Sequence, residues 1–217
     1  MAKGVRASYD CVAEEYGRRY FHEFDHKPFD RETLDRFAER VRGQGPVCDM
    51  GCGPGEVACY LRARGVEDVL GVDISPGMVE QARKLNPGVT FHQGDMLNLE
   101  AKDNSWGGIA AFYSIIHIPR DQVVAALREM RRVLKPEGLL LLTFHVGQEG
   151  VHLDEWWGNE VAVDFYYFET GEMKGYLESA GLEIEEVIER DPYKDVEAQT
   201  RRAYVFAQKP IEKEMHQ

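Results

Sequence analysis

Short apolar runs alternate along the chain with stretches in which apolar residues recur every three or four positions. The runs have the length and composition of buried strands, and the periodic stretches are typical of amphipathic helices. Strands and helices that alternate in this way predict a mostly parallel sheet with helices on both faces. The strands expected in this sheet are residues 47–50, 69–73, 89–93, 108–113 and 139–144.

Two more strands are expected near the C-terminus, at residues 183–189 and 203–207, and the link between them is short enough for an antiparallel pair. If the first of these strands runs parallel to the others, the loop after it emerges at the edge where open α/β sheets bind ligands. Residues 173–180 are expected to form a helix that ends at Gly181.

Two helices are predicted before the first strand. The first is expected to be amphipathic and to present three tyrosines on one stripe. The residues that set this spacing are Tyr9, Val12, Ala13, Tyr16 and Tyr20. The second helix is expected to start near Asp30 as its N-cap, and a glycine-containing break at residues 43–46 separates it from the first strand.

The composition limits the classes of partner. The chain has 217 residues, 38 acidic against 26 basic, and a formal net charge of −12. This balance disfavours binding to nucleic acid or to an anionic membrane. No apolar run has the length of a membrane span and the N-terminus lacks a signal-peptide core, so a cytoplasmic location is expected.

The cysteines do not indicate a metal site. Cys48, Cys52 and Cys59 lie in or beside the first strand and the loop after it, without a Cys-x-x-Cys pair or a histidine-rich partner segment. Zinc sites need such spacings. No metal is therefore expected, and these three cysteines are predicted to be small buried residues.

The loop after the first strand is the most informative segment. Three alternate glycines, Gly51, Gly53 and Gly55, follow the strand, and no phosphate-binding lysine comes after them. Glycine lets the backbone turn sharply and approach a ligand closely. A P-loop needs Gly-Lys-Ser/Thr at its end, and the dinucleotide fingerprint needs its third glycine one residue later. The loop therefore predicts a nucleoside cofactor without a phosphate chain.

Acidic residues follow the next two strands. Asp73 ends the second strand, some twenty residues beyond the glycines, where a carboxylate is able to accept both hydroxyls of a ribose. Asp95 follows the third strand and is suited to an adenine amino group, with Met96 covering the ring. These signals at successive strand ends all lie on the ligand-binding edge of the sheet.

With these pieces in order, residues 9–210 resemble the class I S-adenosylmethionine (SAM) dependent methyltransferases, and most closely their small-molecule, ubiquinone-biosynthesis-like branch. The resemblance implies a three-layer Rossmann-like α/β fold with a seven-stranded, mostly parallel sheet, an antiparallel last-strand pair and an N-terminal helical cap. It also implies one domain over residues 1–210, made of a helical cap (1–45), a cofactor-binding half (46–145) and a substrate-side half (146–210), followed by a polar tail (211–217).

The resemblance further implies which residues hold SAM and its product S-adenosylhomocysteine (SAH). Asp49 and the loop amides would take the methionine part, while the helix that begins near Gly55 would favour its carboxylate. The first helix would close over the cofactor through Tyr16. The complete expected cofactor-binding set is Tyr16, Asp49, Gly51, Cys52, Gly53, Gly55, Asp73, Ile74, Met78, Asp95, Met96, Tyr113 and Ser114.

Methyl transfer from a sulfonium is an in-line displacement, so the protein mainly has to position the reactants and exclude water. The catalytic candidates are Tyr113, His117 and His145, which lie at the ends of the fourth and fifth strands. A histidine among isoleucines, as His117 is, is more often structural than catalytic. Either histidine is able to remove a proton from a hydroxyl acceptor, whereas a neutral bound amine or a thiolate needs no base.

The acceptor is expected to meet residues 146–168, an aromatic segment that resembles a lid or a pocket wall. The alternation from Val161 onward indicates that half of its apolar side chains simply pack. The substrate-pocket candidates are Tyr20, His117, Trp156, Trp157 and Tyr193. Asp154 and Glu155 beside the tryptophans suggest a cationic or aromatic amine as one acceptor class.

The favoured interpretation is an enzyme that methylates a small molecule at nitrogen or oxygen, as a monomer or homodimer. A methyltransferase acting on a protein or another macromolecule remains an alternative. The fourth strand lacks the Asn/Asp-Pro-Pro-Tyr signature of amino-methylating nucleic-acid enzymes, and no basic patch is evident. The other alternative is a catalytically silent, methyltransferase-like subunit that binds or activates a partner.

Overall fold

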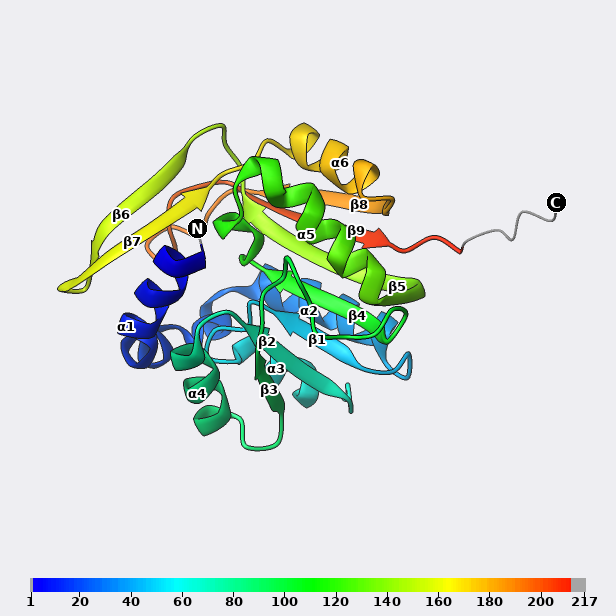
Figure 1. Ribbon diagram of the computed structural model, residues 1–217, viewed down its shortest axis with the longest axis horizontal. Helices are drawn as coiled ribbons and strands as arrows, with labels where there is room; N and C mark the ends of the chain where they lie inside the picture. Colours follow the sequence, from blue (N-terminus) through cyan, green and yellow to red (C-terminus); the bar gives the residue numbers. More distant parts are fainter. Residues whose placement is uncertain (1, 212–217) are drawn as a thin grey trace.

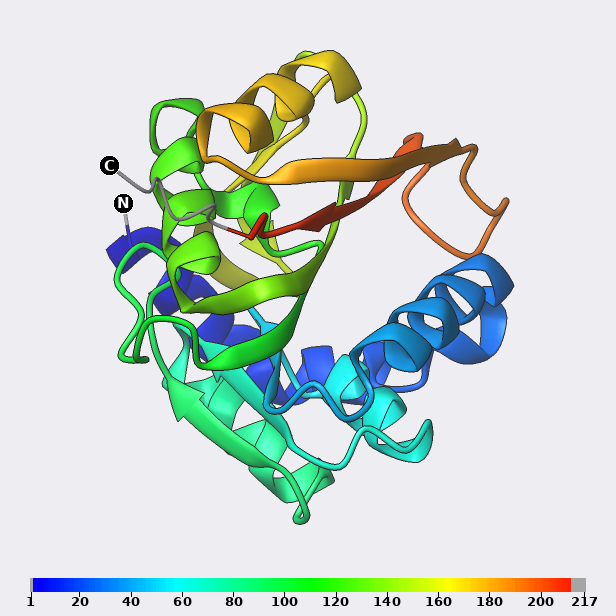
Figure 2. The ribbon, with the colours of Figure 1, turned by 90° about the vertical axis from the view of Figure 1, so that its right-hand side faces the viewer.

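A computed structural model describes residues 2–211, and the side chains from residue 4 onward. Its main sheet has seven strands in the order β3-β2-β1-β4-β5-β9-β8. Figures 1 and 2 show this twisted sheet with helices packed on both sides. The strands are β1 (Val47–Met50), β2 (Val69–Asp73), β3 (Thr90–Gln93), β4 (Trp106–Phe112), β5 (Leu134–His145), β8 (Glu183–Arg190) and β9 (Arg202–Gln208).

The direction of each strand agrees with the predicted architecture. Strands β1 to β5 pair in parallel, and β9 is antiparallel to both β5 and β8. Strand β8 therefore runs parallel to β5, and the loop after it lies at the carboxyl edge of the sheet. The sequence expectation of a seven-stranded sheet with one antiparallel element is confirmed.

Two core clusters lie on opposite faces of the sheet. One packs the helices α2 (Pro28–Val41), α3 (Glu56–Ala63) and α4 (Pro76–Leu85) onto the sheet, and the other packs α5 (Arg120–Val133) and α6 (Thr170–Ser179). Strand β4 supplies both clusters, because Ile109 faces one and Ala110 the other, as alternation along a strand requires.

The remaining elements lie over the carboxyl edge of the sheet. Helix α1 (Ala2–Tyr20) packs against α4 and against a separate hairpin of strands β6 (Gly150–Trp156) and β7 (Asn159–Tyr166). Figure 1 shows α1 and this hairpin side by side at one end of the molecule. Two short 3₁₀ helices, η1 (Glu23–His26) and η2 (Ile115–His117), complete the described chain.

The structure corrects three details of the sequence interpretation. Helix α2 begins at Pro28, so Asp30 lies inside the first turn and is buried instead of capping the helix. Proline is preorganised for the first helical position, which moves the start upstream. Strand β5 begins at Leu134 instead of at residue 139, and Cys59 is exposed, unlike the buried Cys48 and Cys52.

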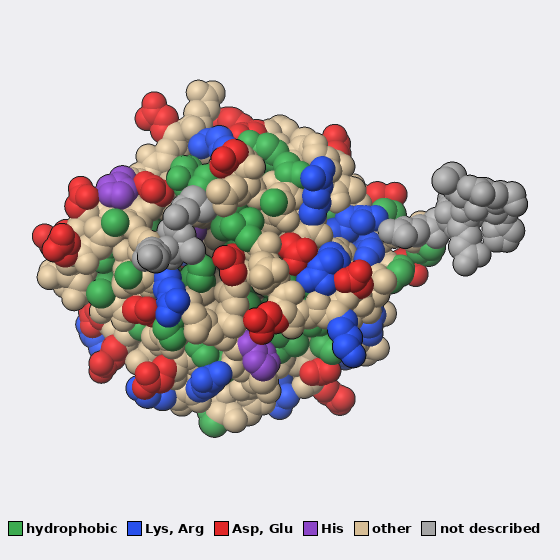
Figure 3. All heavy atoms as spheres, in the orientation of Figure 1, with side chains coloured by type: hydrophobic (Ala, Val, Ile, Leu, Met, Phe, Trp, Pro, Cys, Tyr) green, Lys and Arg blue, Asp and Glu red, His purple; other side chains and the backbone are tan. Residues whose placement is uncertain are grey.

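The domain division within residues 1–210 stays a prediction, and most of the predicted polar tail, residues 212–217, lies outside the described residues. No helix among residues 2–211 is long and apolar enough to cross a membrane. Within the same residues there is no group of three or more histidine, cysteine or acidic side chains placed to hold a metal ion. Acidic side chains are spread over the face shown in Figure 3.

Candidate functional site

One cavity of about 880 Å³ opens at the carboxyl ends of the parallel strands. Its floor includes Gly51 after β1, Asp73 at the end of β2 and His145 at the end of β5, and its walls come from α1, the β6–β7 hairpin and the loop between β8 and β9. Ligands of open α/β sheets bind at this edge. The volume falls in the range of sites for ligands of cofactor size.

The glycine loop forms the tightest part of the cavity. Gly51 has φ +69°, and a Cβ placed on it would lie 2.3 Å from the Cβ of Ser114. Gly53 has φ +50°, but a Cβ there would meet no heavy atom closer than 3.9 Å. The first glycine is therefore required for packing, whereas Gly53 presents bare backbone to the cavity.

Asp73 ties the second strand to the glycine loop. Its carboxylate accepts hydrogen bonds from the amide of Gly53 at 2.9 Å and from the amide of Ser75 at 2.8 Å. Burial raises the pKa of the Asp73 carboxyl to about 6, against the effect of these hydrogen bonds. Because Asp73 lines the cavity beside the glycine backbone, it is able to accept hydrogen bonds from a bound ligand as well.

Asp49 does not face the cavity. Its side chain is 1% exposed and accepts a hydrogen bond of 2.9 Å from the amide of Ala58. Burial raises the pKa of the Asp49 carboxyl to about 8. Asp49 therefore joins β1 to the start of α3, and its predicted contact with the methionine part of a cofactor finds no support in the cavity lining.

The other expected cofactor residues divide into two groups. Those that line the cavity are Tyr16, Gly51, Gly53, Asp73, Ile74, Asp95, Met96, Tyr113 and Ser114. Cys52, Gly55 and Met78 do not line it, and Met78 on α4 is fully buried in a cluster with Val12 and Ala13 of α1. The Asp95 carboxylate is able to accept a further hydrogen bond from a ligand, because among the described residues its side chain accepts one bond, from the amide of Leu97 to Oδ1.

His117 has both ring nitrogens engaged. Nδ1 lies 2.9 Å from the backbone oxygen of Asp164, which only accepts, so Nδ1 carries the proton. Nε2 then accepts from the hydroxyl of Tyr9 at 2.8 Å. Burial lowers the pKa of His117 to about 4. The imidazole is neutral and holds α1 against β7, which favours the structural role that the sequence had left open.

His145 is the more accessible base. Its Nδ1 lies 2.7 Å from Oγ1 of Thr200, and Nε2 has no hydrogen-bond partner among residues 2–211. Burial, followed by the charge of Arg202, lowers the pKa of His145 to about 3, so the ring is neutral near pH 7. Its neighbour Tyr113 packs over it, with ring centroids 5.2 Å apart, and burial raises the pKa of Tyr113 well above its usual value.

An aromatic cluster from α1 and the hairpin covers the cavity. Tyr9, Tyr16, Tyr20, Trp156 and Phe165 line it. Trp157 does not, because it packs on Tyr20 from outside, beneath the guanidinium of Arg19 at 4.8 Å. Asp154 and Glu155 are exposed and also lie off the lining, so the observed wall gives no support to an acceptor cation held by these two acids.

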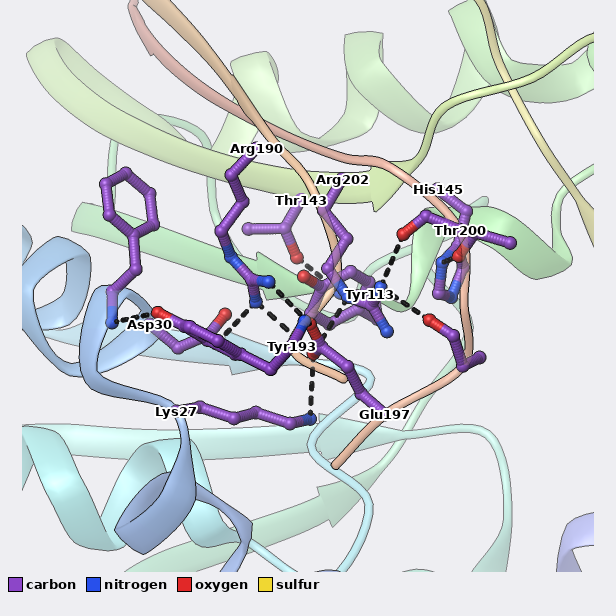
Figure 4. Close-up of polar contacts among 12 residues, drawn as sticks. Lys27, Asp30, Tyr113, Thr143, His145, Arg190, Tyr193, Glu197, Thr200 and Arg202 are labelled. Atoms are coloured by element: carbon purple, nitrogen blue, oxygen red, sulfur yellow. Dashed lines mark hydrogen bonds and ion pairs between the residues drawn. The ribbon is translucent and has the colours of Figure 1, made fainter. Parts of the chain in front are cut away.

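The opposite wall is polar and centres on Glu197 in the loop after β8. Figure 4 shows Lys27, Arg190 and Arg202 converging on this side chain. Its oxygens lie 2.5 Å from Nη1 of Arg190, 3.0 Å from Nε of Arg202 and 3.8 Å from Nζ of Lys27. The Glu197 side chain is 2% exposed, so one buried anion holds the loop in place.

Tyr193 belongs to the support of this loop. Its hydroxyl accepts a hydrogen bond of 3.0 Å from the amide of Phe29, and its ring lies under the guanidinium of Arg190. It does not line the cavity, although the loop does emerge at the active edge as expected. The ordinary anchoring role accounts for what the structure shows of Tyr193.

Sequence reasoning missed several groups that line the cavity, among them Tyr9, Glu23, Lys27 and Glu56. Tyr9 was visible in the tyrosine stripe, but its partner His117 is 108 residues away. Glu56 directly follows the glycine loop, and its position could have indicated a ligand contact. Nothing local in the sequence marks Glu23 or Lys27.

The cavity fits an adenosyl group joined to an amino acid. Two acids, Asp73 and Asp95, face it from the ends of successive strands, and Gly53 leaves room for close approach. The Oγ of Ser114 and one oxygen of Glu56 are buried without a hydrogen-bond partner among the described residues. Buried polar atoms of this kind are costly unless a ligand or water satisfies them.

The comparison with protein families agrees with this geometry, since residues 47–138 match the family model described as a methyltransferase domain. Residues 47–138 of the chain therefore form a methyltransferase domain. The matched segment contains the glycine loop, Asp73, Asp95 and the end of β4.

Relatives of this methyltransferase include malonyl-[acyl-carrier protein] O-methyltransferase from Enterobacter lignolyticus, 30% identical over 61% of the chain and 53% of the relative. The 27-O-demethylrifamycin SV methyltransferase from Amycolatopsis mediterranei is 29% identical over 65% of the chain and 57% of the relative. The chain spans only 36% to 57% of the length of the first curated relatives that it matches.

Among solved structures, the methyltransferase resembles a chain from the complex between the Haloferax volcanii Trm112 methyltransferase activator and the putative methyltransferase. The TM-score is 0.72 at 22% identity, over 96% of this chain and 99% of that chain. At this identity the likeness concerns the fold.

Proposed function

We propose that the protein transfers a methyl group from SAM to a small-molecule acceptor, at nitrogen or oxygen, by in-line displacement. The observation that carries the proposal is a single cavity in which Asp73, Asp95 and the bare backbone of Gly53 face the same space as His145. The names of two relatives, malonyl-[acyl-carrier protein] O-methyltransferase and 27-O-demethylrifamycin SV methyltransferase, support transfer to oxygen, and the second supports a small-molecule acceptor.

Several residues are suited to hold the cofactor. Asp73 would accept from the ribose hydroxyls, with Ile74 beside the ribose, and Asp95 would accept from the adenine amino group, with Met96 covering the adenine ring. The Oγ of Ser114 would gain the partner that it lacks. When bound, SAM supplies a methyl group already activated by its positive sulfur, and SAH remains.

The chain's own contribution is to position the acceptor and to exclude water. The aromatic rings of Tyr9, Trp156 and Phe165 close the cavity on the side of α1 and the hairpin, which lowers the local dielectric. His145 offers Nε2 as an acceptor for a hydroxyl proton. For an amine that binds neutral, the same ring would only orient the N–H group.

The first test measures SAH binding by calorimetry and then transfer of a labelled methyl group from SAM to a panel of phenols, alcohols, amines and carboxylic acids. We expect SAH to bind and at least one acceptor class to become labelled. Binding of SAH without labelling of any small molecule would favour the silent binding or activator subunit. Label recovered in precipitated protein would favour the macromolecular alternative.

The role of His145 is tested by His145→Asn in the same assay. For a hydroxyl acceptor, loss of the base should lower kcat by about 100-fold or more, with SAH affinity within about two-fold of wild type. An unchanged kcat for a hydroxyl acceptor would remove His145 from the mechanism. The cytoplasmic location and the monomeric or homodimeric state stay predictions.

A further inference from the structure

Glu56, the first residue of α3, has a buried carboxylate oxygen without a hydrogen-bond partner among the described residues. Its Oε2 is inaccessible to water, and apart from its own backbone amide no described residue donates a hydrogen bond to its side chain. Glu56 lines the cavity directly beside the glycine loop. A Cβ placed on Gly53 would lie 3.9 Å from Oε2 of Glu56 and 3.9 Å from a ring carbon of Tyr16.

The charge of Lys27 acts on this carboxylate, but its ammonium group is already bound to Glu23 at 2.7 Å and lies 3.8 Å from Glu197. Burial raises the pKa of Glu56 well above its usual value, and the charges of Glu23 and Asp49 add to this effect. The surroundings of Glu56 therefore favour a positively charged donor over a second anion.

Asp49, which the family resemblance assigns to the cofactor's ammonium group, is not accessible from the cavity. Asp49 is 1% exposed, is bonded to the amide of Ala58 and lies off the cavity lining. Glu56 directly follows the glycine loop and does line the cavity. It is flanked by Tyr16, which lies on the cavity surface against Gly53.

We propose that Glu56, with Glu23 behind it, binds the ammonium group at the amino-acid end of SAM in place of Asp49. This inference rests on the proposed function, because it assumes that SAM occupies the cavity. An ammonium group supplies three hydrogen-bond donors and a full positive charge. One donor gives Oε2 of Glu56 a hydrogen bond, and the charge offsets the repulsion between Glu56 and Glu23. Glu56 is then a cofactor-binding residue and takes no part in moving the methyl group.

The experiment compares two ligands and three proteins by titration calorimetry. SAH carries the ammonium group, whereas 5′-methylthioadenosine keeps the adenosyl thioether and lacks the whole amino-acid part. Wild type is compared with Glu56→Gln and with Glu39→Gln, a surface control on α2. We expect Glu56→Gln to bind SAH about tenfold more weakly, or about 1.4 kcal/mol, and to bind 5′-methylthioadenosine within two-fold of wild type.

Proton release provides a second readout. Binding of SAH to wild type should release a proton from Glu56, which is seen as a dependence of the heat on buffer ionisation enthalpy. Glu23, Asp49, Lys27 and Tyr16 are the titratable groups around Glu56, so the informative quantity is the difference between wild type and Glu56→Gln. That difference should approach one proton.

The outcomes separate this inference from the proposed function. Unchanged SAH affinity in Glu56→Gln, with both ligands still bound, would overturn the role of Glu56 and leave the methyltransferase proposal intact. Failure of wild type to bind either ligand would overturn the proposed function itself. Because Glu56→Gln removes an unpartnered buried acid, the variant should fold at least as stably as wild type, which thermal unfolding will verify.

Discussion

The hydroxyl of Tyr9 donates a hydrogen bond of 2.8 Å to Nε2 of His117, and this bond connects α1 to the 3₁₀ helix η2 in the lining of the cavity. The other nitrogen of His117 is bound to the backbone oxygen of Asp164 on β7. One neutral imidazole thus links three elements that line the site, α1, η2 and β7.

Tyr9→Phe tests this link. The variant keeps the ring and removes one buried hydrogen bond, so we expect the free energy of unfolding to fall by about 1 kcal/mol and SAH to dissociate faster. Urea unfolding and stopped-flow release of SAH measure the two effects. Tyr20→Phe is the matched control, because the Tyr20 hydroxyl makes no hydrogen bond among the described residues; equal effects of both variants would contradict the role of the Tyr9 bond.

Gly51 and Gly53 of the glycine loop should respond differently when each is replaced by alanine. Gly51→Ala places a Cβ 2.3 Å from Ser114, so we expect a loss of stability of about 2 kcal/mol or more. Gly53→Ala has open space and should fold with a loss of roughly 1 kcal/mol from its positive φ, while its methyl group obstructs the ligand. Thermal unfolding should therefore show the larger loss of stability for Gly51→Ala. Titration with SAH should show that Gly53→Ala remains folded but binds the ligand more weakly.

Glu197→Gln should strongly destabilise the fold. Arg190, Arg202 and Lys27 would retain their charges around a neutral amide, and removal of one partner of a buried ion pair costs about 3 kcal/mol. Urea unfolding at pH 7 measures the change. Glu80→Gln breaks an exposed pair with Lys84 and should have a far smaller effect, because solvent screens such pairs. A cost for Glu197→Gln as small as this would mean that the network is not important for stability.

The stability of the protein should depend on His117 between about pH 4 and pH 6.5. The folded pKa is lowered to about 4 by burial, whereas an unfolded histidine titrates near 6.5. The unfolded chain therefore binds a proton in this window that the folded chain does not, and the free energy of unfolding falls as the pH is lowered.

Asp73, with a folded pKa of about 6, acts in the opposite direction, so the test compares variants. His117→Gln should show a smaller decrease in unfolding free energy between pH 7 and pH 5 than wild type, measured by urea unfolding at each pH. His26→Gln, at an exposed position, should keep the wild-type slope. An equal pH dependence of the unfolding free energy in His117→Gln and in wild type would contradict this role of His117.

The features that could be predicted from the sequence are those with local causes. The glycine loop and the acid that ends β2 form a short-range pattern, and the buried strands are continuous apolar runs. The sheet, and the edge of it at which the cavity lies, could therefore be predicted from the sequence. Asp30 shows the limit of this reasoning. It precedes an apolar helix as an N-cap would, yet its carboxylate binds Tyr204 at 2.6 Å and Arg190 at 2.9 Å, residues that only the folded sheet brings near.

The hairpin shows a second limit. Strand β7 has the alternation of a half-buried strand at Val161 and Val163, but its partner β6 is mostly exposed and carries almost no periodic signal. Pairing between the two strands, and their contact with α1, depend on the tertiary fold. For the same reason Trp156 and Trp157 looked equivalent in sequence, although only Trp156 faces the cavity.

The β6–β7 hairpin forms no ladder with the seven-stranded sheet, and a bridge between Val146 and Phe168 holds its two ends together. A change in the length of this hairpin therefore leaves the register of every strand in the main sheet unaltered. Insertion or deletion at this single point would therefore reshape the wall that Trp156 and Phe165 form, while Asp73 and Asp95 keep their places at the ends of the parallel strands.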